Sequence, residues 1–135
     1  MTKILVVEDS FSMRSFVRSA LESGGAEFEG IDIVEAAGGF EALRLLPRGP
    51  YDLVVTDINM PDINGLELIQ FIRSNEHHRS TPILLISTQS SERDRERGLL
   101  LGANGYLVKP FTPEELRSRV KAAREKGRPP GPDNG

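Results

Sequence analysis

Short apolar runs alternate along this chain with segments whose apolar residues recur at helical spacing. In five runs nearly every position is apolar, which predicts β-strands that are buried on both faces. These strands are predicted at residues 3–7, 31–34, 52–56, 82–86 and 105–108. The segments between and after them predict five helices. The helices are predicted at residues 10–21, 40–46, 66–72, 91–101 and 113–125, the last with Thr112 as its N-cap.

The alternation of strands with helices predicts an α/β fold. Five strands joined by helical crossovers form a parallel sheet, and right-handed crossovers place helices on both faces of that sheet. In such doubly wound sheets the functional site lies beyond the carboxyl ends of the strands. Residues with chemical roles are therefore expected directly after the apolar runs.

Length and composition restrict the class of protein. The 135 residues suit one domain with a sizeable core, and the absence of cysteine excludes disulfides, thiolate metal sites and cysteine nucleophiles. A net charge of −3 disfavours direct binding to nucleic acid. No apolar run approaches the ~20 residues that span a bilayer, and the amino-terminal run is too short for a signal peptide. A cytoplasmic protein with no membrane contact is therefore expected.

Charged side chains follow three of the predicted strands. Glu8 and Asp9 follow the first strand, and Asp57 follows the third. Three carboxylates at neighbouring strand ends repel one another unless a cation lies among them. Oxygen ligands without His or Cys favour Mg²⁺ over zinc. Lys109 follows the fifth strand and adds a positive charge that can pair with a carboxylate or with a phosphoryl oxygen.

Other polar residues give weaker indications. Ser87 and Thr88 supply hydroxyls after the fourth strand, but no His or Cys follows a strand to complete a hydrolase triad. His77 and His78 lie in a polar stretch and are expected in a solvated loop rather than at a metal site. The sequence contains neither of the two common glycine-rich nucleotide-binding motifs.

The chemistry that these groups allow is phosphoryl transfer to a carboxylate. Asp57 is the best candidate nucleophile, because it follows a central strand and precedes an open loop that contains Pro and Gly. A magnesium ion and Lys109 would neutralise charge on the transferring group. Asp9 would then be a ligand of the metal ion, and Glu8 would give the ion additional support. Taken singly, Asp9 also suits a helix cap and Lys109 a surface position, so this expectation rests on their convergence at one edge.

Four segments carry these residues in a fixed order. They are Val7-Glu8-Asp9-Ser10, residues 57–65 (DINMPDING), Ile86-Ser87-Thr88 and residues 102–111 (GANGYLVKPF). The ordered set resembles the receiver domain of bacterial two-component response regulators, especially single-domain CheY-like chemotaxis regulators. The resemblance covers residues 3 to about 126. It implies a flavodoxin/CheY-like sheet with the strand order 2-1-3-4-5.

The resemblance also implies the roles of the charged residues. Asp57 would accept a phosphoryl group from the phosphohistidine of a sensor histidine kinase or phosphotransfer protein. Asp9, Asp57 and the backbone carbonyl of Asn59 would bind Mg²⁺, and Glu8 would assist through water. Lys109 would contact the phosphoryl oxygen. The chain would then be a phospho-acceptor switch, and it would catalyse only its own phosphorylation and slow dephosphorylation.

The resemblance implies further roles for uncharged residues. Ser87 matches the switch hydroxyl that moves to bond the phosphate, and Thr88 matches the small residue beside the phosphoryl pocket. Tyr106 matches the aromatic residue that turns inward when the hydroxyl moves. Without the resemblance, Tyr106 is equally well interpreted as a half-buried strand aromatic. Asn59 and Gln89 match the two positions that tune dephosphorylation.

The carboxyl-terminal part of the chain carries an excess of positive charge. Up to residue 88 the net charge is −6, and from residue 89 onward it is +3. The resemblance implies that an output target protein binds the face formed by the predicted helix at 91–101, the fifth strand and the last helix. Basic residues gather in this part of the sequence, although a solvated surface with local ion pairs also explains them. They are Arg93, Arg95, Arg97, Arg117, Arg119, Lys121 and Arg124.

Two alternative functions stay open. A Mg²⁺-dependent aspartyl-phosphate phosphatase would need an acid two residues after its nucleophile, and Asn59 stands there. A receiver domain of a longer transcriptional regulator would use the carboxyl-terminal residues as a linker. The favoured division is a receiver domain at 1–126 followed by a mobile Pro/Gly-rich tail at 127–135. The receiver domain is then expected to be a stand-alone response regulator with a role in chemotaxis or motility.

Overall fold

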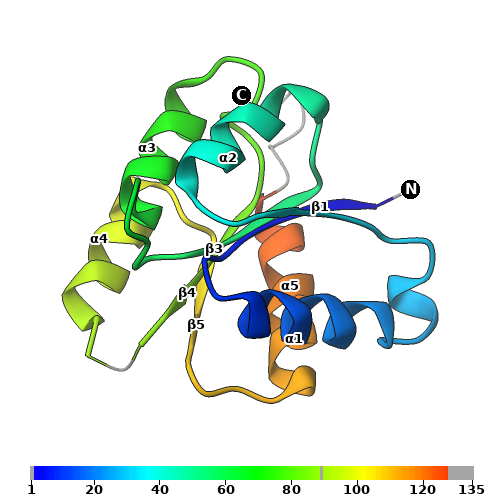
Figure 1. Cartoon of the computed structure of the whole chain (residues 1–135). Helices are drawn as coiled ribbons and strands as arrows, with labels where there is room; N and C mark the ends of the chain where they lie inside the picture. Colours follow the sequence, from blue (N-terminus) through cyan, green and yellow to red (C-terminus); the bar gives the residue numbers. More distant parts are fainter. Residues whose placement is uncertain (1, 89, 128–135) are drawn as a thin grey trace.

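A five-stranded parallel sheet forms the centre of the computed structural model, which describes residues 2–88 and 90–127 (Figure 1). The strands are β1 (Lys3–Val7), β2 (Asp32–Ala36), β3 (Leu53–Asp57), β4 (Ile83–Ser87) and β5 (Gly105–Val108). The helices are α1 (Phe11–Glu22), α2 (Gly39–Leu45), α3 (Gly65–Ser74), α4 (Glu92–Leu101) and α5 (Pro113–Gly127). Two 3₁₀ turns, η1 (Ala26–Phe28) and η2 (Leu46–Arg48), were not predicted from the sequence.

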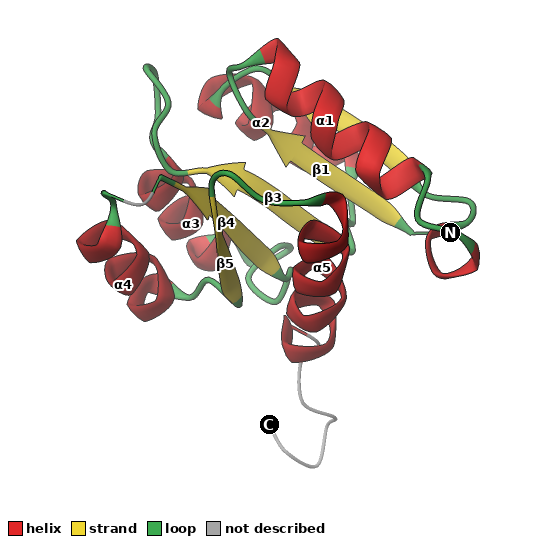
Figure 2. Ribbon diagram, turned by 90° about the horizontal axis from the view of Figure 1, so that it is seen from below, coloured by secondary structure: helices red, strands yellow, loops and turns green. Residues whose placement is uncertain are grey.

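The sheet has the order β2-β1-β3-β4-β5, and every neighbouring pair is parallel. This confirms the predicted fold class and strand order. Helices cover both faces, with α1 and α5 on one side and α2, α3 and α4 on the other (Figure 2). The order reverses between β1 and β3, so the carboxyl ends of these two central strands form the switch point at which a site is expected.

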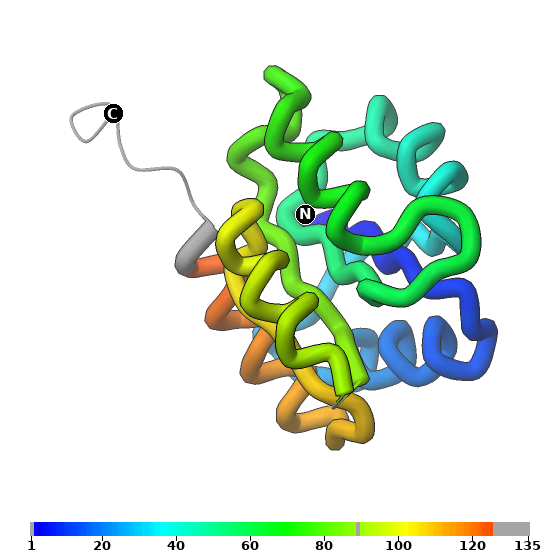
Figure 3. The backbone as a smooth tube through the Cα atoms, turned by 90° about the vertical axis from the view of Figure 1, so that its left-hand side faces the viewer, coloured from blue at the N-terminus to red at the C-terminus, as the bar shows by residue number. Residues whose placement is uncertain are grey.

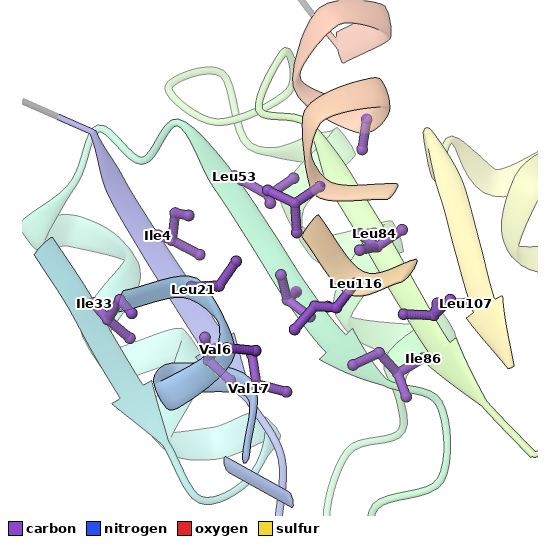
Figure 4. Close-up of a cluster of buried hydrophobic side chains, with 14 of the residues drawn as sticks. Ile4, Val6, Val17, Leu21, Ile33, Leu53, Leu84, Ile86, Leu107 and Leu116 are labelled. Carbon is purple, nitrogen blue, oxygen red and sulfur yellow. The ribbon is translucent and has the colours of Figure 1, made fainter. Parts of the chain in front are cut away.

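Side chains that alternate along the strands fill two hydrophobic cores. On one face Val6, Leu53 and Ile86 pack with Val17 of α1 and Leu116 of α5 (Figure 4). On the other face the intervening strand residues pack mainly against α2 and α3. This second core includes Leu5, Val54, Leu85, Leu68 and Ile72. Because both faces are buried, the strands appear in the sequence as continuous apolar runs.

Side-chain caps fix the helix ends near the carboxyl edge of the sheet. The hydroxyl of Ser10 accepts a 3.3 Å hydrogen bond from the Met13 amide at the start of α1. The N-cap of α2 is Gly38, which has no side chain to supply this acceptor. The Asp62 carboxylate instead accepts bonds of 3.1 and 2.9 Å from the Gly39 and Phe40 amides. These bonds lower the pKa of Asp62, and they tie the loop after β3 to α2.

Several boundaries differ from the prediction by one or two residues. The polar residues Asp57 and Ser87 form the last positions of β3 and β4, because their backbones continue the hydrogen-bond ladder of the sheet.

The expectation that His78 lies in a solvated loop was wrong. His78 is 7% exposed, because the turn after α3 folds back and buries it, and this burial lowers its pKa.

The predicted tail begins one residue inside α5, which extends to Gly127. Residues 128–135 lie outside the described residues. No helix in the described part of the chain is both long enough and apolar enough to cross a membrane.

Candidate functional site

Asp57 lies at the carboxyl end of the central strand β3. It is 4% exposed, and its Oδ1 lies 3.4 Å from the amide nitrogen of Asn59. The loop after β3 returns closely over the strand end, where the Gly65 amide donates a 2.8 Å bond to the Ile58 carbonyl. A Cβ atom at residue 65 would overlap the carbonyl of Asp57. The glycine therefore lets the loop approach the backbone at the end of β3 closely.

Glu8 and Asp9 bring two more carboxylates to the same edge from the end of β1. One oxygen of each of Glu8, Asp9 and Asp57 lies within 4.8 Å of the others. Glu8 is buried and accepts a 3.0 Å bond from the Ser10 amide, whereas Asp9 is exposed. The sequence thus correctly predicted that these three acids converge.

Lys109 reaches the cluster from the loop after β5. Its Nζ donates to Glu8 Oε1 at 3.1 Å and to Asp57 Oδ2 at 3.2 Å. Residues 8, 57 and 109 come from three different strand ends, and only the parallel topology brings them together.

The short distances and the burial perturb the protonation of this cluster. Burial, reinforced by the neighbouring acids, raises the pKa of Glu8 to about 7. Burial by itself would lower the pKa of Lys109, but the negative charges of Asp57 and Glu8 outweigh it and raise that pKa. Lys109 is therefore a fixed ammonium, whereas Glu8 changes its charge near neutral pH in the absence of another cation.

The donor set fits a small, hard divalent cation. All the side-chain donors of the cluster are carboxylate oxygens, which Mg²⁺ prefers. Lys109 supplies one positive charge against three carboxylates, so the cluster retains negative charge that a divalent cation would balance. Asp9 is exposed, which leaves one side of the cluster open to solvent.

Ser87 and Thr88 lie beside this cluster at the end of β4. The Ser87 side chain is fully buried and its hydroxyl oxygen accepts a 3.3 Å bond from Arg95 Nη1 on α4. Thr88 is exposed, and its hydroxyl lies 3.0 Å from that of Ser91. Gln89, the second position expected to tune dephosphorylation, lies outside the described residues.

Tyr106 is half-buried on β5 and packs partly against the core beneath α3. Two cationic side chains approach its ring, with Arg95 Cζ 5.4 Å and Arg119 Cζ 5.7 Å from the ring centroid. Sequence reasoning missed the contacts of Arg95, because its position on a polar helix indicated only a solvated arginine.

The seven basic residues do not share one surface. Arg117, Lys121 and Arg124 turn toward the amino-terminal part of the chain, where they donate to the Ala20 carbonyl, to Glu27 and to the Thr2 hydroxyl. These three basic residues thus contact α1, η1 and the amino-terminal segment, and the Lys121–Glu27 ion pair agrees with the interpretation as a surface with local ion pairs. Arg93, Arg95 and Arg97 belong to α4, which faces the viewer in yellow-green in Figure 3.

Comparison with known proteins decides the family. A model of the response regulator receiver domain matches residues 4–121. The chain belongs to this family. Its receiver domain is 36% identical to the chemotaxis protein CheY homolog of Campylobacter jejuni, over 88% of this chain and 89% of the relative. It is 37% identical to the chemotaxis protein CheY1 of Helicobacter pylori, over 88% and 94% of the two chains.

Solved structures and longer relatives agree with this assignment. The solved structure of the chemotaxis response regulator CheY4 of Vibrio cholerae superimposes with a TM-score of 0.81 at 35% identity, covering 91% of this chain and 98% of that one. The response regulator ArlR of Staphylococcus saprophyticus is 39% identical over 90% of this chain, which spans 52% of ArlR. The receiver domain is thus a phospho-acceptor switch of two-component signalling rather than a conventional enzyme, and membership of the family implies a histidine kinase as partner.

Proposed function

We propose that this receiver domain accepts a phosphoryl group on Asp57 from a sensor histidine kinase or phosphotransfer protein and then changes its affinity for an output protein. The observation that carries the proposal is the placement of Asp57. Its carboxylate lies at the end of a central strand, within reach of Lys109 and next to two further acids.

The chemistry follows from this placement. A carboxylate oxygen of Asp57 attacks the phosphorus of the phosphohistidine, the P–N bond breaks, and the imidazole nitrogen leaves with the bonding electrons. Lys109 stabilises the added negative charge, because its ammonium already lies 3.2 Å from Asp57 Oδ2. The product is an acyl phosphate on Asp57.

The acidic cluster would hold Mg²⁺ during this transfer. Asp9, Asp57 and the backbone carbonyl of Asn59 would be the ligands, with Glu8 acting through water. The bound ion would neutralise charge on the phosphoryl oxygens. Once the ion balances the cluster, Glu8 can be ionised below the pH at which it loses its proton in the metal-free protein.

The remaining site residues would transmit and time the signal. Ser87 would bond the phosphoryl oxygen, and Thr88 would border the pocket. Tyr106 would change its rotamer with Ser87. Asn59 and Gln89 would set how fast water removes the phosphoryl group.

The output protein would bind the face formed by α4, β5 and α5, in the cytoplasm and without direct contact with nucleic acid or membrane. The names of the Campylobacter jejuni and Helicobacter pylori relatives favour chemotaxis or motility as the process. A second candidate is a receiver domain of a longer regulator, which is favoured by the match to about half of ArlR. The phosphatase alternative is disfavoured by Asn59, which cannot act as a general acid.

Labelling with a small acyl-phosphate donor tests the proposal. In the presence of Mg²⁺ and acetyl phosphate, intact-mass measurement should detect one added phosphoryl group on the wild-type chain. Asp57→Asn should abolish the gain while the far-UV circular dichroism is unchanged. Asp32→Asn, at an exposed strand position, is the matched control and should label like wild type. Full labelling of Asp57→Asn would refute the assignment.

A further inference from the structure

The guanidinium of Arg95 connects the end of β4 to the aromatic residue on β5. Its Nη1 donates a 2.8 Å bond to the Thr88 carbonyl and a 3.3 Å bond to the Ser87 hydroxyl oxygen. Its Cζ lies 5.4 Å from the centroid of the Tyr106 ring. One side chain of α4 therefore touches both a buried hydroxyl beside the acidic cluster and an aromatic ring at the surface.

The contact orients the Ser87 hydroxyl toward α4. Ser87 is completely buried, so the direction of its side chain depends on the few groups around it. Among the described residues, Arg95 is the side chain that bonds this hydroxyl, and no hydrogen bond joins it to Asp57. The hydroxyl oxygen is the acceptor in this bond and its proton stays free to donate. A bond to a group carried by Asp57 therefore breaks the contact with Arg95 when the Ser87 side chain rotates toward the end of β3.

Arg95 has only neutral partners in these contacts. They are a hydroxyl, a carbonyl and an aromatic ring, and none of the ion pairs in the described ranges includes Arg95. By contrast, Arg18 pairs with Glu35 at 2.6 Å and is held by that charge. An arginine with neutral partners can be redirected when one of them turns away.

Arg119 contacts the same ring from a different element. Its Cζ lies 5.7 Å from the Tyr106 centroid, and its Nη1 donates a 3.2 Å bond to the Tyr106 carbonyl. It makes no hydrogen bond to Ser87 in the described part of the chain. The ring thus has one cationic neighbour that depends on Ser87 and one that does not.

We propose that Arg95 is a positioning residue that holds the Ser87 hydroxyl and the Tyr106 ring in the arrangement of the unphosphorylated chain. When Ser87 turns toward a phosphoryl group on Asp57, Arg95 loses that partner and its hold on the ring weakens. Arg95 therefore links Ser87 to Tyr106, and it raises the concentration of phosphoryl mimic that is needed to move the Tyr106 ring. The phosphorylation of Asp57 that breaks the Arg95–Ser87 contact rests on the proposed function, whereas the contact itself is present in the structure.

The link is tested first without any phosphate mimic. The chain has two tyrosines, so incorporation of 3-fluorotyrosine gives two ¹⁹F resonances, and Tyr51→Phe assigns them. Ser87→Ala should shift the Tyr106 resonance in the wild-type background. The same substitution should leave it unmoved in the Arg95→Gln background, because the connecting side chain is gone. Equal shifts in both backgrounds would overturn the link.

A titration with beryllofluoride and Mg²⁺ then tests the threshold. For Arg95→Gln the midpoint of the Tyr106 response should fall at least threefold below that of wild type. Arg44→Gln removes the same charge from an exposed position of α2 and should keep the wild-type midpoint. If the wild-type chain responds and both variants have the same midpoint, the role of Arg95 is overturned and the proposed function is unaffected. A wild-type chain without any response would instead contradict the proposed function.

Discussion

The ammonium of Lys109 lies 3.2 Å from Asp57 Oδ2, although 52 residues separate the two in the chain. Parallel strands bring their carboxyl ends to one edge of the sheet, and this contact is a direct consequence of that arrangement. The same ammonium contacts Glu8 at 3.1 Å. One positive charge therefore has two carboxylate partners, and its removal should affect metal binding and phosphoryl binding in opposite directions.

Lys109→Ala should strengthen Mg²⁺ binding and weaken the response to beryllofluoride. The ammonium repels a cation in the cluster, so its loss should lower the Mg²⁺ dissociation constant several-fold. The phosphoryl mimic loses a charged donor, which corresponds to about 1.5–3 kcal/mol, or at least tenfold in affinity. Calorimetric titrations measure both constants. Lys121→Ala, on the outer side of α5, is the control, and parallel losses for both ligands would contradict the assigned role.

Glu8→Gln should stabilise the metal-free protein at high pH only. The folded chain holds Glu8 with its pKa raised from 4.5 to about 7, so folding favours the protonated form. The stability from this group is fully present below about 4.5 and is lost as the pH rises through about 7. Urea unfolding with EDTA should show a gain of up to about 3 kcal/mol for the variant at pH 8.

At pH 5 most of that gain should be absent, because wild-type Glu8 is then mostly protonated in the folded chain. Glu76→Gln, at an exposed position after α3, should change the unfolding free energy equally at both pH values. A pH-independent gain for Glu8→Gln would show that burial does not control this carboxyl.

Gly65→Ala should destabilise the protein and disturb the phospho-acceptor. The added methyl group overlaps the carbonyl of Asp57 and comes within 2.9 Å of the Ile58 Cα atom. Neither backbone group can move without shifting the end of β3, so a loss of about 1–3 kcal/mol is expected in urea unfolding. Gly105→Ala is the control, because a Cβ there meets its nearest neighbour, Leu84 Cδ1, at 3.5 Å. Equal losses for both variants would argue against the close approach.

Glu35→Gln should lower stability at neutral pH and progressively less in acid. The Arg18 guanidinium bonds Glu35 at 2.6 Å and, with help from Arg14, lowers the pKa of this carboxyl below 4.5. The stabilisation is present above about 4.5 and is lost as the pH falls through the lowered value. Because the pair is partly exposed, about 1 kcal/mol is expected at pH 7. Thermal unfolding from pH 7 to pH 3 measures the change, with exposed Glu29→Gln as the control that should show none.

The sequence predicted the sheet and the acidic cluster through one physical rule. Strands buried on both faces have to be apolar throughout, so each strand is visible as a run, and the first polar residues after the run lie at the sheet edge. Glu8, Asp9, Asp57 and Lys109 were all found in this way. The rule needs only the order of the residues and the alternation of elements.

Contacts between side chains on different elements could not be predicted in this way. The bonds of Arg95 to Ser87 and Thr88, the capping of α2 by Asp62 and the burial of His78 depend on which face of a helix or turn meets which strand. A polar helix has no apolar stripe that fixes its rotation, so the sequence did not distinguish Arg95 from an ordinary surface arginine.

The sequence alone therefore determined which residues stand at the edge of the sheet and which chemistry they can perform, because backbone periodicity and burial impose those choices locally. The tertiary structure decided how the edge connects to the surface, because long flexible side chains take their direction from neighbours that are distant in the chain. Arg95 between Ser87 and Tyr106 is the clearest instance of the second kind.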